Sequence, residues 1–171
     1  MAKRHLRPIQ IVGNVALVTL TRGYTAIIDV DMLAEIGSWN WQAEVCDGKV
    51  YAKRLASAKE GPGRRGIYLH RAVFGDTIHA IDHINGDGLD NRRENLREAT
   101  AAQNAKNRRL NANSSSGLKG VTRLPSGRWQ AQIASDGVKY RLGTYTSKTD
   151  AHSAYVSASI RLHGEYGNPS G

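Results

Sequence analysis

"AIDHINGDGLDNRRENLREATAAQNAKN", Ala80–Asn107, is the stretch that decides the fold of the central part of the chain. The run around Asp82 and His83 is strand-like, the following "NGDG" is a cluster of turn residues, and "NLREA" fits a short return strand. The last part, "TAAQNAKN", has helical composition, with Thr100 as a candidate N-cap. We therefore predict a hairpin followed by a helix.

The segment from His70 to about Arg109 resembles the HNH nuclease family. Its ββα-metal motif places a histidine at the end of the first strand, an asparagine in the connecting loop and a metal ligand on the helix. The phrase "DHINGDGLDNRRENLR" followed by "QN" is similar to the phage and intron homing-endonuclease branch, in which asparagine commonly replaces the last histidine of the name. An Asp-His pair or an Asn-rich loop alone would be ordinary, but their ordered combination favours a nuclease.

The resemblance implies a role for each of four residues. Asp82 and Asn104 would be metal ligands, His83 the general base, and Asn95 the loop residue that holds His83 in position. The chemistry fits, because a carboxylate and an amide oxygen leave positions open on a divalent cation for phosphate oxygens and water. Mg²⁺ is the expected ion and Mn²⁺ is the alternative. A histidine of near-neutral pKa can accept the proton of the attacking water.

Other polar residues of this segment have two interpretations. Three Asx residues are predicted to shape the loop by bonding nearby backbone amides: Asp87, Asp90 and Asn91. Three arginines either hold phosphates or pair with Glu94 and Glu98: Arg92, Arg93 and Arg97. His70 and Arg71 stand in an "LHR" element typical of this branch, where His70 either supports the active site or is a packed structural histidine.

Composition points to a polyanionic partner. The chain has 171 residues, with 24 Lys and Arg against 15 Asp and Glu, a net charge of +9 and a pI near 9.9. Such a balance favours nucleic acid or an anionic membrane surface. Residues 68–110 carry seven basic and six acidic groups, whereas both flanks are basic. Flanks that hold a phosphate backbone around a cation-binding centre would give this distribution, and so would surface solubility.

Cysteine and hydropathy narrow the class of protein. The single cysteine, Cys46, excludes an intramolecular disulfide framework and a Cys-rich zinc site, so no zinc ribbon is expected. No apolar run approaches a membrane span, and no signal-peptide core follows the N-terminus. We expect an intracellular protein that is not secreted and has no membrane partner. The resemblance suggests the cytoplasm or nucleoid of a bacterial or phage-infected cell.

The expected fold class is α+β, in four segments. Residues 1–67 form a small α+β segment whose role is uncertain: it supports the catalytic unit or adds a phosphate contact. Residues 68–110 form the ββα-metal unit, residues 111–117 a linker, and residues 118–171 a C-terminal domain. In the first segment, strands are expected around the turn at Arg22-Gly23, then a helix in "DVDMLAEIGS" and a hairpin around "CDG".

The C-terminal segment is predicted to be a three-stranded sheet packed on one helix. "LKGVTRL", "RWQAQIA" and "VKYRLGTY" are separated by the turn signals "PSG" and "SDG", and "SKTDAHSAYVSASIRLHG" follows with helical spacing of apolar residues. Strand alternation directs five apolar residues toward the helix: Trp129, Ala131, Ile133, Tyr140 and Leu142. It leaves polar residues pointing away, as a sheet that reads the major groove requires: Arg128, Gln130, Gln132, Lys139 and Arg141.

This segment resembles the ethylene-response-factor DNA-binding domain of plants, the APETALA-type fold, which also occurs fused to HNH nucleases. The matching elements are "KGV", "SGRW.A.I", "LGTY", "A..AY..A" and the closing "G...GN". By that resemblance six residues would contact DNA: Lys119, Thr122, Arg123, Arg128, Lys139 and Arg141. Thr122, Leu124 and Ser126 occupy positions where plant members typically have Arg, Arg and Trp, so base specificity is not carried over.

The sequence therefore predicts an HNH homing-type DNA endonuclease with a C-terminal recognition module. One active site per chain would nick duplex DNA as a monomer or break both strands as a homodimer. A DNA-binding regulator with an inactive HNH unit is the alternative. An RNA-binding or RNA-cutting protein is disfavoured, because the outward sheet face lacks the paired aromatics typical of RNA-stacking sheets.

Overall fold

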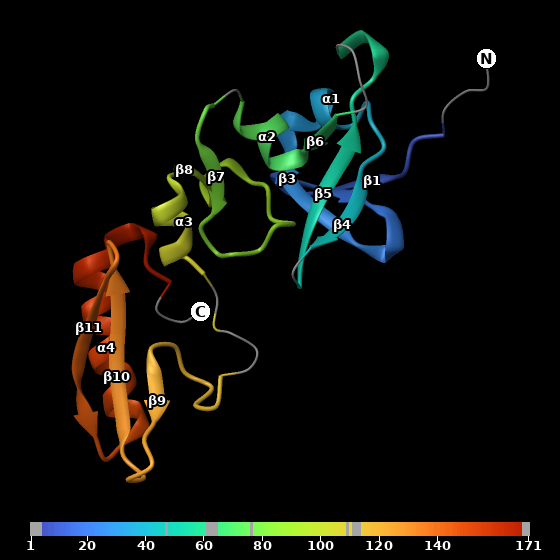
Figure 1. Cartoon of the computed structure of the whole chain (residues 1–171). Helices are drawn as coiled ribbons and strands as arrows, with labels where there is room; N and C mark the ends of the chain where they lie inside the picture. Colours follow the sequence, from blue (N-terminus) through green and yellow to red (C-terminus); the bar gives the residue numbers. More distant parts are fainter. Residues whose placement is uncertain are drawn as a thin grey trace. The chain divides into compact units, whose positions relative to one another are not determined.

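A computed structural model of the chain describes residues 5–46, 48–60, 65–75, 77–108, 110 and 114–168. The chain divides into two compact units, Met1–Glu98 and Ala99–Gly171, and each is described by itself (Figure 1). Both combine small antiparallel sheets with few helices, in agreement with the α+β class. The four-segment division stays a prediction, and its linker lies partly outside the described residues, at 111–113.

The first sheet has the order β1-β2-β3, with alternating burial on its central strand. Its strands are β1 (Ile9–Val12), β2 (Val15–Thr19) and β3 (Thr25–Asp29). The 3-10 turn η1 (Thr21–Gly23) confirms the turn expected at Arg22-Gly23, and Arg22 has a φ of 61° there. Strand β1 was not expected, because three of its four residues are exposed and carry no burial pattern. The expected helix is short: η2 (Val30–Met32) runs into the single turn α1 (Leu33–Ile36).

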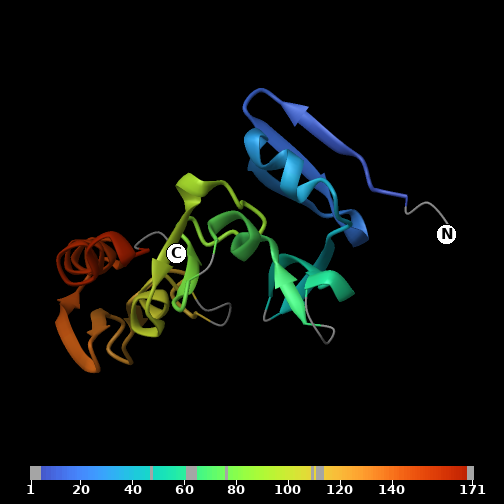
Figure 2. The ribbon, with the colours of Figure 1, turned by 90° about the horizontal axis from the view of Figure 1, so that it is seen from above.

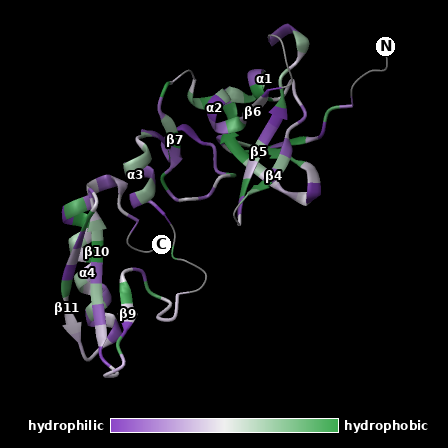
Figure 3. Cartoon of the chain, viewed as in Figure 1, coloured by the Kyte–Doolittle hydropathy of each residue, from purple (hydrophilic) through white to green (hydrophobic). Residues whose placement is uncertain are grey.

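The second sheet has the order β4-β5-β6. Its strands are β4 (Gln42–Cys46), β5 (Lys49–Leu55) and β6 (Gly66–Tyr68), and η3 (Ala58–Glu60) follows β5. The pairing of β4 with β5 confirms the hairpin around "CDG". Figure 3 shows mostly hydrophilic residues along β5. One of them, Arg54, is buried: it pairs with Glu60 and lies 4.0 Å from the ring centroid of Trp39. A buried guanidinium is tolerated when it is paired in this way.

The central hairpin and its helix form as predicted. Strands β7 (Ala80–His83) and β8 (Leu96–Ala99) pair, with η4 (Arg93–Asn95) just before β8. Helix α3 (Ala101–Lys106) begins with a capping box in which Thr100 and Gln103 bond each other's backbone amides. A further helix, α2 (Leu69–Phe74), follows β6 directly. It was not predicted, because a short apolar run does not separate strand from helix.

One hydrophobic core serves the whole first unit. It draws on both sheets, α1, α2, β7 and β8, and its largest members include Ile28, Trp41, Leu69, Ile81 and Leu96. This core crosses the expected boundary at residue 67. The N-terminal segment and the central hairpin are therefore packed as one body in the described residues.

The second unit confirms the predicted sheet and helix. Strands β9 (Val121–Arg123), β10 (Trp129–Ser135) and β11 (Val138–Tyr145) lie in the order β11-β10-β9. Helix α4 (Lys148–His163) covers one face of this sheet and ends in η5 (Gly164–Tyr166) (Figure 2). Small side chains at the contact, such as Ala131 and Ala151, allow the close approach. No helix among the described residues has the length and apolarity needed to cross a bilayer.

Candidate active site

Asp82 is buried next to an arginine at the end of β7. Its side chain is 6% exposed, and Arg97 on β8 donates to its Oδ2 atom from Nη2 at 2.8 Å and from Nε at 3.1 Å. These bonds pair Arg97 with Asp82, a partner that was not predicted for it. A guanidinium partner of this kind compensates a buried carboxylate for the hydration that it loses.

His83, the next residue, is also buried, but its side chain contacts a different set of residues. Its ring centroid lies 5.2 Å from that of His70 and 6.0 Å from that of Tyr51. Its Nε2 atom lies 3.4 Å from Oδ1 of Asn91. Asp82 and His83 are thus adjacent in the chain, but different elements hold their side chains.

The bond to Asn91 favours one tautomer of His83. Nδ2 of Asn91 donates to the carbonyl oxygen of Leu89 at 3.0 Å, so its Oδ1 atom is the one that faces the imidazole. An amide oxygen only accepts, so this contact favours the tautomer with the ring proton on Nε2. In the neutral ring the proton-accepting lone pair is then on Nδ1. Asn91 is fully buried, as expected of a residue that orients a base.

Burial keeps both histidines uncharged near neutral pH. It lowers the pKa of His83 from its usual value of 6.5, while the bond to Asn91 and the charge of Asp82 act in the opposite direction. Burial also lowers the pKa of His70 to about 3, and the neighbouring charges of His83 and Arg71 lower it further. An uncharged His83 is in the form that can accept a proton.

Asn95 holds the chain that leaves His83. Its backbone oxygen accepts from the amide of Ile84 at 2.9 Å, and its Oδ1 accepts from the amide of Asn85 at 3.0 Å. Its Nδ2 donates to the carbonyl oxygen of Asp90 at 2.7 Å. These bonds fix the backbone on both sides of the loop. This arrangement fits the role predicted for Asn95. The residue acts on the backbone that follows His83, and none of these bonds is to the imidazole ring of His83.

The remaining Asx residues shape the loop, as predicted. Oδ1 of Asp87 accepts from the amide of Leu89, and Asp90 binds Nδ2 of Asn85. Asp90 also pairs with Arg92 at 2.8 Å, which holds the pKa of Asp90 below its usual value. Such local bonds are what Asx side chains make in turns.

Strands of the N-terminal segment contact this loop. Ile27 of β3 donates its amide to Leu89 and accepts from the amide of Asn91, each at 2.8 Å. Gly88 lies so close to β5 that an added Cβ would be 2.5 Å from the Val50 carbonyl oxygen and 2.6 Å from the Tyr51 ring. The loop that carries Asn91 is therefore fastened to two strands of the N-terminal segment. Of the two predicted roles for that segment, support of the catalytic unit is the one that these contacts favour.

The predicted phosphate-binding arginines of this unit are engaged by carboxylates. Arg92 pairs with Glu94 as well as Asp90, in line with the pairing interpretation. Arg93 pairs with Asp31 of η2 at 2.7 Å. Arg71 is exposed and donates to the backbone oxygens of Thr77 and His79 at 3.3 Å. Arg92 and Arg93 remain partly exposed, with 33% and 50% of the side chain accessible, so a phosphate can still reach them.

Asn104 belongs to the second unit. It lies on α3, is exposed, and its backbone amide bonds the Thr100 oxygen at 2.9 Å. Among the described residues, no group of three or more His, Cys, Asp or Glu could hold a metal ion. The donor groups that the two predicted ligands offer, a carboxylate on Asp82 and an amide oxygen on Asn104, are of the kind that Mg²⁺ accepts.

The second unit presents polar side chains on the sheet face away from α4. Gln130 and Gln132 alternate with the buried Ala131 and Ile133, as predicted. Gln132 lies opposite Arg141 in the register, beyond a bulge at Ala131/Gln132. Three side chains at the predicted DNA-contacting positions share this outward face and are exposed: Thr122, Lys139 and Arg141. Arg123 is also exposed, but it lies opposite Trp129 in the register and therefore on the other face.

Three residues of this unit differ in part from the predicted arrangement. Tyr140 lies opposite the buried Ile133 but is 42% exposed, so it lies at the margin of the core. Arg128 donates to the Thr144 backbone oxygen at 2.9 Å. Arg123 lies 5.7 Å from the centroid of the Trp129 ring. Both arginines are exposed and each has a contact within the second unit.

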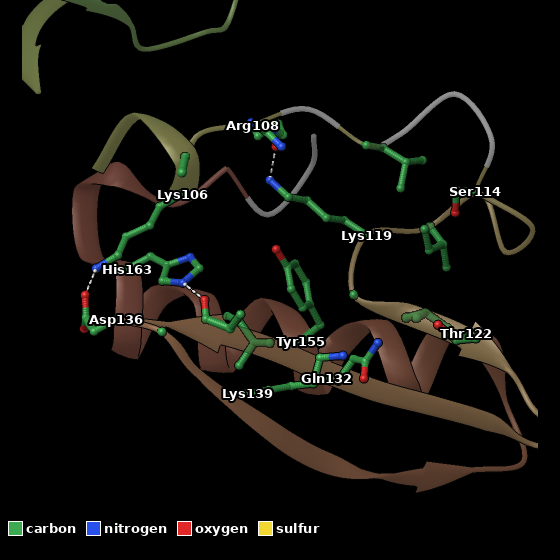
Figure 4. A pocket seen from close by; sticks show the side chains of 18 of the residues that line it. Lys106, Arg108, Ser114, Lys119, Thr122, Gln132, Asp136, Lys139, Tyr155 and His163 are labelled. Carbon is green, nitrogen blue, oxygen red and sulfur yellow. Dashed lines mark hydrogen bonds and ion pairs between the residues drawn. The ribbon is translucent and has the colours of Figure 1, made fainter. Parts of the chain in front are cut away.

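Lys119 lies in a cavity rather than on the sheet face. It donates to the backbone oxygens of Arg108 and, at 2.7 Å, of Asn168, and burial lowers its pKa. The cavity measures about 740 Å³ and is rich in donor groups. Figure 4 shows Tyr155 pointing into it from α4, with an ion pair between Lys106 and Asp136 at its rim.

Several residues around His83 were missed from the sequence. Tyr51 and Tyr68 are strand residues whose contact with the histidines depends on sheet register. Asn91 was assigned only to loop shape. In "DNRREN" it lies four residues before a second asparagine, Asn95. This spacing was a signal that two loop asparagines hold the region around His83.

Comparison with known proteins identifies the central segment. The family model of HNH endonucleases matches residues 68–106, from β6 to the end of α3. An HNH endonuclease of Acanthamoeba polyphaga mimivirus, L560, is 29% identical over 110 residues, which are 60% of this chain. The match covers 57% of that relative's length. No solved structure matches the chain. Residues 68–106 are thus similar to the HNH endonuclease family, and the chain spans little more than half the length of the relative it matches.

Proposed function

We propose that this chain is a metal-dependent endonuclease of the homing type that hydrolyses phosphodiester bonds in duplex DNA. One observation carries the proposal: within the segment that the HNH family model matches, His83 is buried, burial lowers its pKa, and its Nε2 atom faces Oδ1 of Asn91, an arrangement that favours Nδ1 as the basic nitrogen. A base prepared in this way can remove a proton from water. The protein would act inside the cell, where its DNA substrate is.

The residues divide the chemistry among them. Asp82 and Asn104 would hold a divalent cation, Mg²⁺ or Mn²⁺, which when bound supplies positive charge to the scissile phosphate. His83 accepts the proton of the attacking water at Nδ1. Asn91 holds the opposite edge of the ring, and Asn95 keeps the backbone after His83 in place. In the same proposal the second unit is an APETALA-type module that positions the duplex with its outward polar face.

Plasmid cleavage tests this function. Supercoiled plasmid is incubated with the full chain and Mg²⁺ or Mn²⁺, and His83→Ala is compared with wild type and with His79→Ala, which removes an exposed histidine of the same unit. We expect wild type and His79→Ala to cut, and His83→Ala to lose roughly 100-fold or more in rate, the contribution of a general base. Nicked circles would indicate action on one strand, and linear plasmid a double break by a homodimer. An intact plasmid with every metal would refute the proposal.

One observation favours the alternative, a DNA-binding regulator with an inactive HNH unit. Asp82, the predicted carboxylate ligand, is already paired with Arg97. If this pair excluded the cation, the protein would bind duplex DNA with unchanged affinity when Mg²⁺ is added and would not cut it. A gel-shift assay in parallel with the plasmid assay separates the two functions.

A further inference from the structure

A layer of aromatic rings lies behind His83. His70 contacts the His83 ring nearly at right angles, with an interplanar angle of 86°. Tyr51 contacts the same ring at 52° and lies 6.1 Å from His70. Tyr68 stacks on His70, with centroids 5.4 Å apart and an angle of 19°. The four rings come from β5, β6, α2 and β7, so three other elements meet at the histidine that ends β7.

A charged pair anchors the outermost ring. Tyr68 donates its hydroxyl to Oε2 of Glu44 on β4. Lys53 of β5 bonds Oε1 of the same carboxylate at 2.5 Å, and its ammonium lies 5.0 Å from the Tyr68 ring centroid. Lys53 lies opposite Tyr68 in the sheet register. The carboxylate thus ties the tyrosine hydroxyl and the lysine together across three strands. Such a charge-assisted cluster restricts the tyrosine rotamer.

We propose that Tyr68 is a positioning residue for His83, held by Glu44 and Lys53 and acting through His70. The proposal rests on the proposed function in taking His83 as the base. The bond to Asn91 fixes one atom of the imidazole and leaves its plane able to turn about that atom. Contacts from His70 and Tyr51, which approach at different angles, define the plane. Tyr68 defines the plane of His70 by stacking.

The chemistry of His70 agrees with a passive supporting role. Burial holds the pKa of His70 at about 3, so its ring is uncharged when His83 accepts a proton. A charged residue in the same place would oppose the formation of the imidazolium. An aromatic ring gives contact area and a fixed orientation without adding charge.

Two variants of the full chain separate stacking from anchoring. Tyr68→Leu removes the ring, whereas Tyr68→Phe keeps the ring and removes only the hydroxyl bond to Glu44. The control is Tyr24→Leu, a partly buried tyrosine packed against the same core. Cleavage is measured as kcat and KM on plasmid. The tautomer of His83 is read by long-range ¹H–¹⁵N NMR, with its signals assigned from their absence in His83→Ala.

We expect Tyr68→Leu to lower kcat roughly tenfold or more with KM little changed, because a small misplacement of a catalytic group has effects of this order. Tyr68→Phe, which removes only the anchoring bond to Glu44, should give a smaller, intermediate loss of kcat, and Tyr24→Leu should keep wild-type kcat. In Tyr68→Leu the Nε2–H signals of His83 should broaden or give way to a mixture of tautomers. Unchanged kcat and unchanged His83 signals in a folded Tyr68→Leu would overturn the proposal.

The NMR measurement tests the positioning role separately from the nuclease function. If wild type does not cut DNA but His83 changes its signals in Tyr68→Leu, the positioning role stands and the function falls. If wild type cuts and neither kcat nor the signals respond, the positioning role falls alone. Should Tyr68→Leu fail to fold, Glu44→Gln replaces it: this change weakens the anchor while keeping every ring. An intermediate loss of kcat then supports the proposal, and wild-type kcat and signals contradict it.

Discussion

His83 and the outward face of the C-terminal sheet are held in opposite ways. His83 is buried, and Asn91, His70 and Tyr51 contact its ring from separate elements. The sheet face presents Lys139 and Arg141 as exposed side chains on β11, a strand in which no residue is fully buried. One region is fixed by packing before any substrate arrives, and the other keeps its side chains adaptable.

The difference follows from what each region does in the proposed function. A general base must have the correct tautomer and direction when the substrate binds, and that is achieved by burial and by neighbours that are themselves fixed. A surface that contacts phosphates and base edges gains from long, hydrated side chains. Substitutions around His83 should therefore change rate and stability together. Substitutions on the sheet face should change DNA affinity alone.

The largest effect is expected at Asn91. Asn91→Ala removes the acceptor that faces Nε2 of His83 and one of the donors to the Leu89 carbonyl oxygen. We expect the cleavage rate to fall roughly 10- to 100-fold, as for other residues that orient a catalytic histidine. The free energy of unfolding should fall by about 1–3 kcal/mol. Plasmid cleavage and urea unfolding measure both quantities.

A control isolates the catalytic part of this effect. Asn40 also makes two bonds with its side chain, one with the amide of Arg7 and one with the carbonyl oxygen of His5. Asn40→Ala should lower stability without changing the rate of the folded protein. Equal rate losses in Asn40→Ala and Asn91→Ala would show that Asn91 has no special relation to His83.

The contact between the loop and β5 gives the next effect. Gly88→Ala places a methyl group 2.5 Å from the Val50 carbonyl oxygen and against the Tyr51 ring. Because these are backbone and packed ring atoms, the loop must shift, and we expect a loss of about 1–3 kcal/mol in the free energy of unfolding. The matched change Gly66→Ala meets mainly the flexible end of Lys53 and should cost less. Thermal or urea unfolding compares the two, and equal losses would contradict tight seating of the loop.

The sequence predicted what local signals specify. The central hairpin, the capping box at Thr100 and the three C-terminal strands all follow from turn residues, a cap and alternation within a few positions. The adjacency of Asp82 and His83, with Asn95 later in the loop, also pointed to the HNH segment that the family comparison matches.

What surrounds His83 could not be predicted in the same way. Tyr51 contacts His83, and Tyr68 contacts His70, because β5 and β6 pair in one register and α2 begins directly after β6. A shift of one residue would turn both tyrosines to the other face. The partner of Asp82 was also missed, because Arg97 has nearer glutamates in sequence but lies on the strand paired with β7. Contacts between neighbouring strands can be identified only once the pairing of the strands is known.

The burial of His70 predicts acid sensitivity. The unfolded chain binds a proton at His70 below about pH 6.5, whereas the folded chain, with the pKa of His70 at about 3, does not. The unfolded state therefore binds more protons in this interval, and stability falls as the pH falls from 6.5 toward 3. His70→Phe should reduce that slope by at most about 1.4 kcal/mol per pH unit, the value for one proton. Urea unfolding between pH 7 and 4, with His79→Phe as control, tests this, and equal slopes in the two variants would contradict it.

The smallest effect is expected on the sheet face. Arg141→Gln removes one exposed charge opposite Gln132. If Arg141 contacts a phosphate, duplex affinity falls a few-fold and the slope of log K against log salt decreases by about 1. Stability should stay within about 0.5 kcal/mol of wild type, because a surface change breaks no packing. Fluorescence anisotropy with a mixed-sequence duplex at several salt concentrations measures the slope. Arg161→Gln, an exposed arginine on α4, should leave it unchanged. Equal salt slopes in Arg141→Gln and wild type would show that Arg141 does not contact a phosphate. The DNA would then bind elsewhere, and the proposed role of the outward sheet face would be wrong.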